Sequence, residues 1–226
     1  KVMAGDEIVG IGCGISHGNT GWIAHVIVPQ NHRRKGIGRA VVDHLVALLS
    51  SSGCESISLV ATDDGLPLYS KVGFKTQIPY AFFVRSGPVV DADVSSDRVR
   101  RYQVADQAQL LSLDRAISGE DRTRFLVDKM AGAQVYEDMG VVFGFYLPEA
   151  GEGLVMADTV NAGIALMDVR VRNVNAAVLP TANTHGTEFL ANVGFKETKR
   201  STRMVWGKQF PWRPDRLYNR IAGNLG

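Results

Sequence analysis

The chain has 226 residues, 45% of them hydrophobic and 21% charged, which allows a substantial core and excludes a disordered or collagen-like protein. Its length fits one large domain or two small ones. Its 25 basic and 23 acidic residues are interspersed, so the net charge of +2 gives no argument for a nucleic-acid or membrane partner.

The first half of the chain predicts a hairpin followed by alternating helices and strands. Two apolar segments, residues 7–17 and 20–29, are joined by a turn and are expected to be strands. The run Gly10-Ile11-Gly12-Cys13-Gly14 lies inside the first strand and indicates close backbone packing. The next predicted elements are a helix at 36–50, a strand at 56–61, a helix at 66–72 and a strand at 77–84.

The second half predicts a similar mixture of elements after a linker at residues 88–97. Periodicity favours helices at 106–118, 119–130 and 161–169, and strands at 134–137, 140–147 and 176–179.

Two segments repeat each other at a constant offset of 121. Residues 61–75 read ATDDGLPLYSKVGFK and residues 182–196 read ANTHGTEFLANVGFK. Each copy is expected to be a strand end, a glycine-containing loop, a short helix and a glycine stop before another strand. The repeat predicts two related α+β domains, at residues 1–97 and 98–226. Residues 98–130 have no counterpart in the first domain, so we expect about 30 residues of that domain to precede residue 1.

The two cysteines, Cys13 and Cys54, belong to no CxxC motif or Cys/His cluster. This argues against a disulfide framework and a structural metal site, and it favours a reducing, cytoplasmic compartment. No apolar run approaches the roughly 20 residues that span a bilayer. We therefore expect a protein with no metal and no membrane partner.

The main chemical signal is a basic, glycine-containing loop between a strand and a helix. It reads Val28-Pro29-Gln30-Asn31-His32-Arg33-Arg34-Lys35-Gly36-Ile37-Gly38-Arg39. Glycines let backbone N–H groups approach an anion, and a helix N-terminus adds partial positive charge, so a diphosphate is the expected ligand. A Walker A loop is excluded because Arg39 follows Gly38, and a Rossmann fingerprint because Val41 replaces its third glycine.

Two motifs together resemble the GCN5-related N-acetyltransferase (GNAT) superfamily. The Arg33-x-x-Gly36-x-Gly38 loop is similar to the acetyl-CoA loop of that family, and Leu68-Tyr69-x-Lys71-x-Gly73-Phe74 is similar to its later helix-to-strand motif. The second half resembles the degenerate acetyltransferase-like domain found behind some of these enzymes. The resemblance covers nearly the whole chain and implies two GNAT-like domains, each a twisted, mixed, mostly antiparallel sheet flanked by helices.

The resemblance also implies roles for individual residues. Tyr69 corresponds to the general acid that protonates the departing CoA thiolate, which suits a phenol protonated at neutral pH. The implied cofactor-binding residues are Val26, Ile27, Val28, Arg33, Arg34, Lys35, Gly36, Ile37, Gly38 and Arg39.

The residues do not identify a general base. Trp22 and Ala24 occupy the positions expected to face the site, and neither is a base. His25 has the opposite parity, while Asp63 and Asp64 follow the next strand and could act through water. Thr62 stands where many members have an asparagine that contacts the cofactor, so this chain departs from the family at that one contact.

The second domain is not expected to bind acetyl-CoA in the same way. No Lys or Arg occurs between Met130 and Asp168, so a diphosphate there would lack compensating charge. The counterpart of Tyr69 is Leu190. The aromatic stretch formed by Trp206, Phe210, Trp212 and Tyr218 is interpreted as core packing or a plug between domains.

Three functions follow from these patterns. The leading hypothesis is an acetyl-CoA-dependent N-acetyltransferase that acts on a small-molecule or peptide amine. The alternative is a non-catalytic acyl-CoA-binding or regulatory module, consistent with the missing base. Nucleic-acid binding is disfavoured because the basic residues outside the loop are scattered. The acceptor and the oligomeric state are left open.

Overall fold

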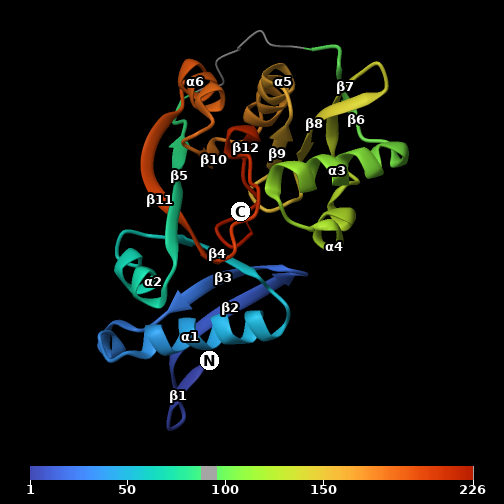
Figure 1. The fold of residues 1–226 in the computed structure, drawn as a ribbon. Helices are drawn as coiled ribbons and strands as arrows, with labels where there is room; N and C mark the ends of the chain where they lie inside the picture. The colour runs from blue at the N-terminus through green and yellow to red at the C-terminus, as the bar shows by residue number, and fades with distance from the viewer. Residues whose placement is uncertain (88–95, 226) are drawn as a thin grey trace. The chain divides into compact units, whose positions relative to one another are not determined.

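The computed structural model describes residues 1–87 and 96–225, which form two compact units (Figure 1). The first unit comprises Lys1–Gln77, Ser201–Phe210 and Gly223–Gly226, and the second comprises Ile78–Arg200 and Pro211–Ala222. Each unit therefore takes segments from both sides of residue 97. Most of the predicted linker, residues 88–95, lies outside the described part of the chain.

The first unit is built on a sheet whose strands are mostly antiparallel. Strands β1 (Val2–Ala4), β2 (Glu7–His17) and β3 (Thr20–Ile27) form an antiparallel meander. β3 then pairs in parallel with β4 (Ser56–Ala61), and β4 pairs antiparallel with Thr202–Gly207 of β11 (Lys196–Gly207). The 3-10 turn η1 (Gln30–His32) and helices α1 (Ile37–Ser51) and α2 (Leu66–Val72) complete the unit.

Helix α1 packs very closely on β2 because that strand is rich in glycine. A Cβ atom on Gly10 would lie 2.7 Å from Ile37 Cγ2, and one on Gly12 would lie 2.6 Å from Val41 Cγ1. The prediction that these glycines serve close backbone packing is confirmed. The apolar face of α1, with buried Val42 and Leu45, forms the core of this unit.

The second unit repeats the order of the first unit's strands and helices, with further elements before and after them, around its own core. Its five-stranded antiparallel sheet has the order β12-β9-β8-β7-β6, and β10 pairs antiparallel with Tyr80–Val84 of β5. The strands are β5 (Lys75–Val84), β6 (Val99–Arg101), β7 (Gln134–Asp138), β8 (Val141–Leu147), β9 (Leu154–Ala157), β10 (Ala176–Pro180) and β12 (Leu217–Asn219). The helices and 3-10 turns are η2 (Val104–Asp106), α3 (Gln107–Ser118), α4 (Thr123–Leu126), η3 (Val127–Lys129), α5 (Val160–Val171), α6 (Thr184–Asn192) and η4 (Pro214–Arg216).

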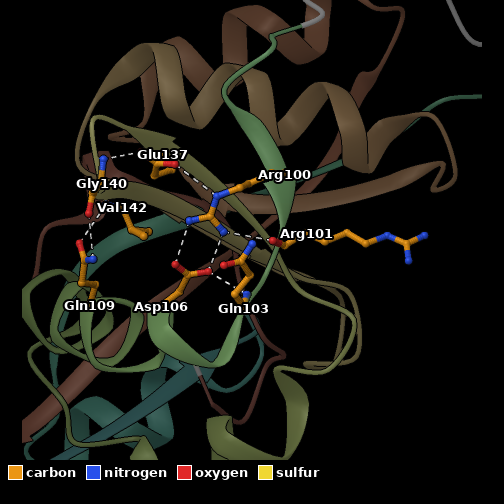
Figure 2. Close-up of polar contacts among 8 residues, drawn as sticks. All are labelled: Arg100, Arg101, Gln103, Asp106, Gln109, Glu137, Gly140 and Val142. Atoms are coloured by element: carbon orange, nitrogen blue, oxygen red, sulfur yellow. Dashed lines mark hydrogen bonds and ion pairs between the residues drawn. The ribbon is translucent and has the colours of Figure 1, made fainter.

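A polar network ties β6, β7 and the start of α3 together (Figure 2). The Arg100 guanidinium donates two hydrogen bonds to the Asp106 carboxylate, at 2.8 and 2.9 Å, and contacts Glu137 at 3.3 Å. Asp106 also accepts the backbone N–H of Gln103 at 2.8 Å. These bonds hold the pKa of the Asp106 carboxyl below its usual range, mainly through the hydrogen bonds from Arg100.

The predicted α+β fold class is confirmed, with two sheets of mostly antiparallel strands flanked by helices. The predicted helix at 119–130 is wrong. Gly119, at a φ of 73°, ends α3, and the Asp121 carboxylate accepts the backbone N–H of Thr123, so a new four-residue helix begins there. Among the described residues, none of the helices has the length and apolar character needed to cross a bilayer.

Candidate functional site

The candidate site begins where β3 and β4 part. Their parallel pairing runs from Thr20/Ser56 to Trp22/Ser58, although β3 continues to Ile27. The register between β2 and β3 shifts in the same region, and His25 adopts a φ of 52° there, which marks a β-bulge. The parallel pairing ends before this bulge, and β3 splays away from β4 there.

A cavity of about 530 Å³ lies in the first unit beside this splay. Nine of the eleven residues predicted as catalytic or cofactor-binding line it: Val26, Ile27, Val28, Arg33, Arg34, Gly36, Gly38, Arg39 and Tyr69. The other lining residues are His32, Thr62, Asp64, Gly65 and Leu68. Lys35 and Ile37 are not among the lining residues. Ile37 instead packs over Gly10 of β2.

The loop before α1 presents unpaired backbone donors and cationic side chains to the cavity. Arg34 and Gly36 adopt positive φ angles of 61° and 82°, and no side chain caps the first turn of α1. The first amides of the helix are therefore available to an anion. The Arg33 guanidinium is fixed to the strand end because its Nε donates to the carbonyl oxygen of Val28 at 3.1 Å.

Tyr69 enters the cavity from α2. Its ring makes an edge contact with Phe74, with 6.0 Å between centroids, and burial raises the pKa of its phenol. Gly65 leaves room for the ring, since a Cβ atom there would lie 2.9 Å from Tyr69 Cε2. The phenol is thus held protonated at neutral pH, in contact with the same cavity as the loop.

The candidates for a general base occupy different places. Trp22 and Ala24 are buried, and His25 lies exposed on the bulge. Asp64 lines the cavity, whereas Asp63 does not. Asp64 and Tyr69 therefore line the same cavity.

His32 also lines the cavity, although it was not among the predicted site residues. Its Nε2 lies 3.3 Å from Glu7 Oε1, so the pair connects η1 to the start of β2 beside the cavity. The position of His32 inside the basic loop is the sequence signal that could have included it.

Comparison with known proteins identifies both halves of the chain. The acetyltransferase (GNAT) family model matches residues 2–74, and an acetyltransferase (GNAT) domain model matches residues 110–219. The chain is 31% identical to the uncharacterized N-acetyltransferase YitH of Bacillus subtilis (strain 168), over 99% of this chain and 83% of that protein. The chain belongs to the acetyltransferase (GNAT) family. Because each half matches a GNAT model, it is a tandem GNAT protein.

Two further similarities place this tandem GNAT protein among its relatives. A proposed acetyltransferase from Pyrococcus horikoshii shares its fold, with a TM-score of 0.82 and 22% identity over 98% of this chain and 78% of that one. The glucosamine 6-phosphate N-acetyltransferase of Trypanosoma brucei brucei is 34% identical over 55 residues. That match covers 24% of this chain and 37% of that enzyme.

In the second GNAT unit, a side chain caps the start of α5, the helix that corresponds to α1. Thr159 Oγ1 accepts the backbone N–H of Ala162 at the start of α5, and Asp158 in front of it is paired with Arg213 at 2.7 Å. Leu190, the counterpart of Tyr69, is fully buried. The helix that corresponds to α1 therefore has one of its first amides capped by a side chain, and it lacks the cationic loop of the first unit.

Proposed function

We propose that this tandem GNAT protein is an acetyl-CoA-dependent N-acetyltransferase whose transfer site is the cavity of the first unit. The observation that supports it is one cavity that joins an uncapped helix start, arginine side chains and a protonated tyrosine. In the second unit the corresponding helix start is capped by Thr159. The proposal therefore assigns acetyl transfer to the first unit alone.

The cavity fits the chemistry of acetyl-CoA. The diphosphate is assigned to the open amides of α1 with Arg33, Arg34 and Arg39, because charge-assisted hydrogen bonds to phosphate are strong. The amide-containing pantetheine arm is assigned to the backbone of Val26–Val28, at the strand that leaves β4. Lys35 and Ile37 do not line the cavity, and we propose that they contact the diphosphate through their backbone.

The proposed reaction is a direct transfer. A neutral amine attacks the thioester carbonyl carbon, the C–N bond forms and the C–S bond breaks. The CoA thiolate then takes the phenolic proton of Tyr69, and backbone N–H groups near Val28 polarise the carbonyl oxygen. Asp64 is the proposed route for the amine proton, through water, because it is the carboxylate that lines the cavity.

The acceptor is proposed as an amine of a small molecule or a peptide. The Trypanosoma brucei brucei relative is named for glucosamine 6-phosphate, so an amino sugar phosphate belongs in a panel with amino acids, peptides and polyamines. The proposed compartment is the cytoplasm, because Cys13 and Cys54 are both free thiols.

The test measures acetyl-CoA consumption with and without each amine, followed by mass spectrometry of the products. Acetylated product together with free CoA supports the proposal. Tight acetyl-CoA binding with neither transfer nor amine-stimulated release would favour the alternative, a non-catalytic acyl-CoA-binding or regulatory module. Trp22 and Ala24 occupy the positions expected for a general base, and both are buried and neither is a base. The experiment therefore includes this alternative.

A further inference from the structure

The internal repeat shows which pair of strands in the second unit corresponds to β3 and β4, the strands that part at the candidate site. β4 of the first unit corresponds to β10 of the second, and the offset of 121 places Asn183 at the position of Thr62. Thr62 lines the cavity beside the splayed strand β3. The strand that corresponds to β3 is β9, which precedes α5 as β3 precedes α1. The gap between β9 and β10 is therefore the counterpart of the site in the first unit.

In the second unit this gap contains the C-terminal segment Leu217–Ile221, here called the strap. Figure 1 shows β12, which forms most of the strap, between β10 and β9. On one side Leu217 and Asn219 pair with Met156 and Val155 of β9. On the other side the backbone N–H of Arg220 donates to the carbonyl oxygen of Val178 in β10 at 3.0 Å. The strap thus hydrogen-bonds to both walls of the gap, as an added strand does.

Two asparagine side chains complete this recognition. Asn183 Nδ2 donates to the carbonyl oxygen of Leu217 at 3.0 Å, from the position that Thr62 occupies in the first unit. Asn219 Oδ1 accepts the backbone N–H of Val178 at 2.8 Å, and its Nδ2 donates to the carbonyl oxygen of Gly153 at the same distance. Both asparagines are almost completely buried. Each of these bonds therefore gives a hydrogen-bond partner to a polar group that could not reach water.

The strap is also fastened by packing and charge. The Tyr218 ring lies over α5 at Gly163, where a Cβ atom would be 2.0 Å from the ring carbon Cζ. Arg220 pairs with Glu152 through two contacts of 2.9 and 3.0 Å. Every residue of the strap is buried. A segment held in this way excludes any other chain from the gap.

We propose that the strap is a built-in occupant of a latent groove for an extended, amide-bearing chain such as pantetheine. The second unit then binds its own C-terminal segment where the first unit binds the arm of acetyl-CoA. The comparison with the first unit rests on the proposed function, whereas the occupancy of the gap rests on the contacts of the strap alone. A full-length chain accordingly binds one acetyl-CoA.

Hydrogen–deuterium exchange of the full-length chain tests this assignment. In the unaltered protein the amides of residues 217–221 should exchange slowly. In the double variant Asn183→Ala with Asn219→Ala they should exchange at least about tenfold faster, because two buried side chains that anchor the strap are lost. Excess pantetheine should then slow exchange in β9 and β10 of this variant only. Asn192→Ala, at an exposed position of α6, is the matched control and should leave exchange unchanged.

Unprotected strap amides in the unaltered protein, or a loosened groove that pantetheine does not protect, would overturn the proposal. If the double variant unfolds, calorimetric titration of the unaltered chain decides: one acetyl-CoA per chain supports the sealed groove and two overturn it. An absence of acetyl transfer with a protected strap would refute the proposed function while leaving the strap assignment in place.

Discussion

At the scale of single residues, Tyr69 is the side chain on which the proposed chemistry depends most. It reaches the cavity from α2, and its neighbour Gly65 leaves space for the ring. Burial raises its pKa, so the phenol keeps its proton through the neutral range and can give it to a thiolate formed nearby. A neutral phenol adds no positive charge to the cavity.

Tyr69→Phe is expected to lower kcat about 10²–10⁴-fold while it changes the Kd of acetyl-CoA only a few-fold. The ring and its contact with Phe74 remain, so the effect isolates the hydroxyl group. Steady-state kinetics and calorimetry measure the two quantities. Equal kcat values for the variant and the unaltered enzyme would remove Tyr69 from the mechanism.

Asp106 shows how one residue can carry pH-dependent stability. Its carboxylate accepts two bonds from Arg100 and one from the backbone of Gln103, and its folded-state pKa is lowered. A carboxyl with a depressed pKa stabilises the fold fully above its unfolded pKa of about 3.9 and loses this contribution as pH falls through the folded pKa.

Asp106→Asn should reduce the free energy of unfolding by about 1–3 kcal/mol at pH 7, because Arg100 loses a buried ionic partner. The difference between the two proteins should shrink as the pH is lowered below about 4. Denaturant titrations at several pH values measure it. Asp128→Asn, at an exposed position, serves as the control, and a pH-independent difference would contradict the assignment.

At the scale of elements, the proposed anion binding depends on the start of α1. α1 has no capping side chain, whereas α5 is capped by Thr159. An uncapped helix start leaves N–H groups that must find a partner in water or in a ligand. The arginines of the preceding loop add formal charge at the same place. The start of α1 therefore combines backbone N–H donors with positive electrostatic potential.

Arg33→Gln with Arg34→Gln should raise the Kd of acetyl-CoA about tenfold or more and weaken its dependence on salt, because two charges that face the diphosphate are lost. Fluorescence or calorimetric titration at two salt concentrations checks this. Arg115→Gln removes an arginine from an exposed ion pair of α3 and should leave both quantities unchanged. An unchanged Kd in the double variant would place the diphosphate elsewhere.

At the scale of the whole molecule, the near-neutral net charge conceals an unequal use of charge. The first unit places its arginines at a cavity, while the second buries several of its charged groups in ion pairs. Arg122 and Asp114 are each only 2% exposed at their side chains and form such a pair. A buried ion of this kind depends on its partner, since desolvation is otherwise uncompensated.

Arg122→Met should therefore lower the free energy of unfolding by about 3–5 kcal/mol, because it leaves the Asp114 carboxylate buried without this partner. Equilibrium unfolding in urea measures the loss. Adding Asp114→Asn to this variant should recover part of the stability, and a double variant less stable than the single one would contradict the explanation.

Much of the fold was predictable because its signals are local. Apolar periodicity located α1 and α5 to within about two residues, which is the usual precision of element boundaries. The predicted helix at 119–130 was wrong because the local bond from the backbone N–H of Thr123 to Asp121 starts a new helix, and because Arg122 turns back to pair with Asp114. The short strands β1, β9 and β12 carry too few residues for a pattern and are defined only by the strands beside them.

The sequence by itself determined the repeat, the glycine packing of β2 and the basic loop, because these depend on neighbours in the chain and on the identity of single residues. The tertiary structure alone decided that β3 bends away at His25, that Arg33 is anchored on Val28 and that Asp64 shares a cavity with Tyr69. It also decided that the strap fills the gap between β9 and β10. Pairing between strands that are distant in the sequence depends on which sheet edge lies beside them in the folded chain. The residues of a short strand carry no local pattern that specifies this edge.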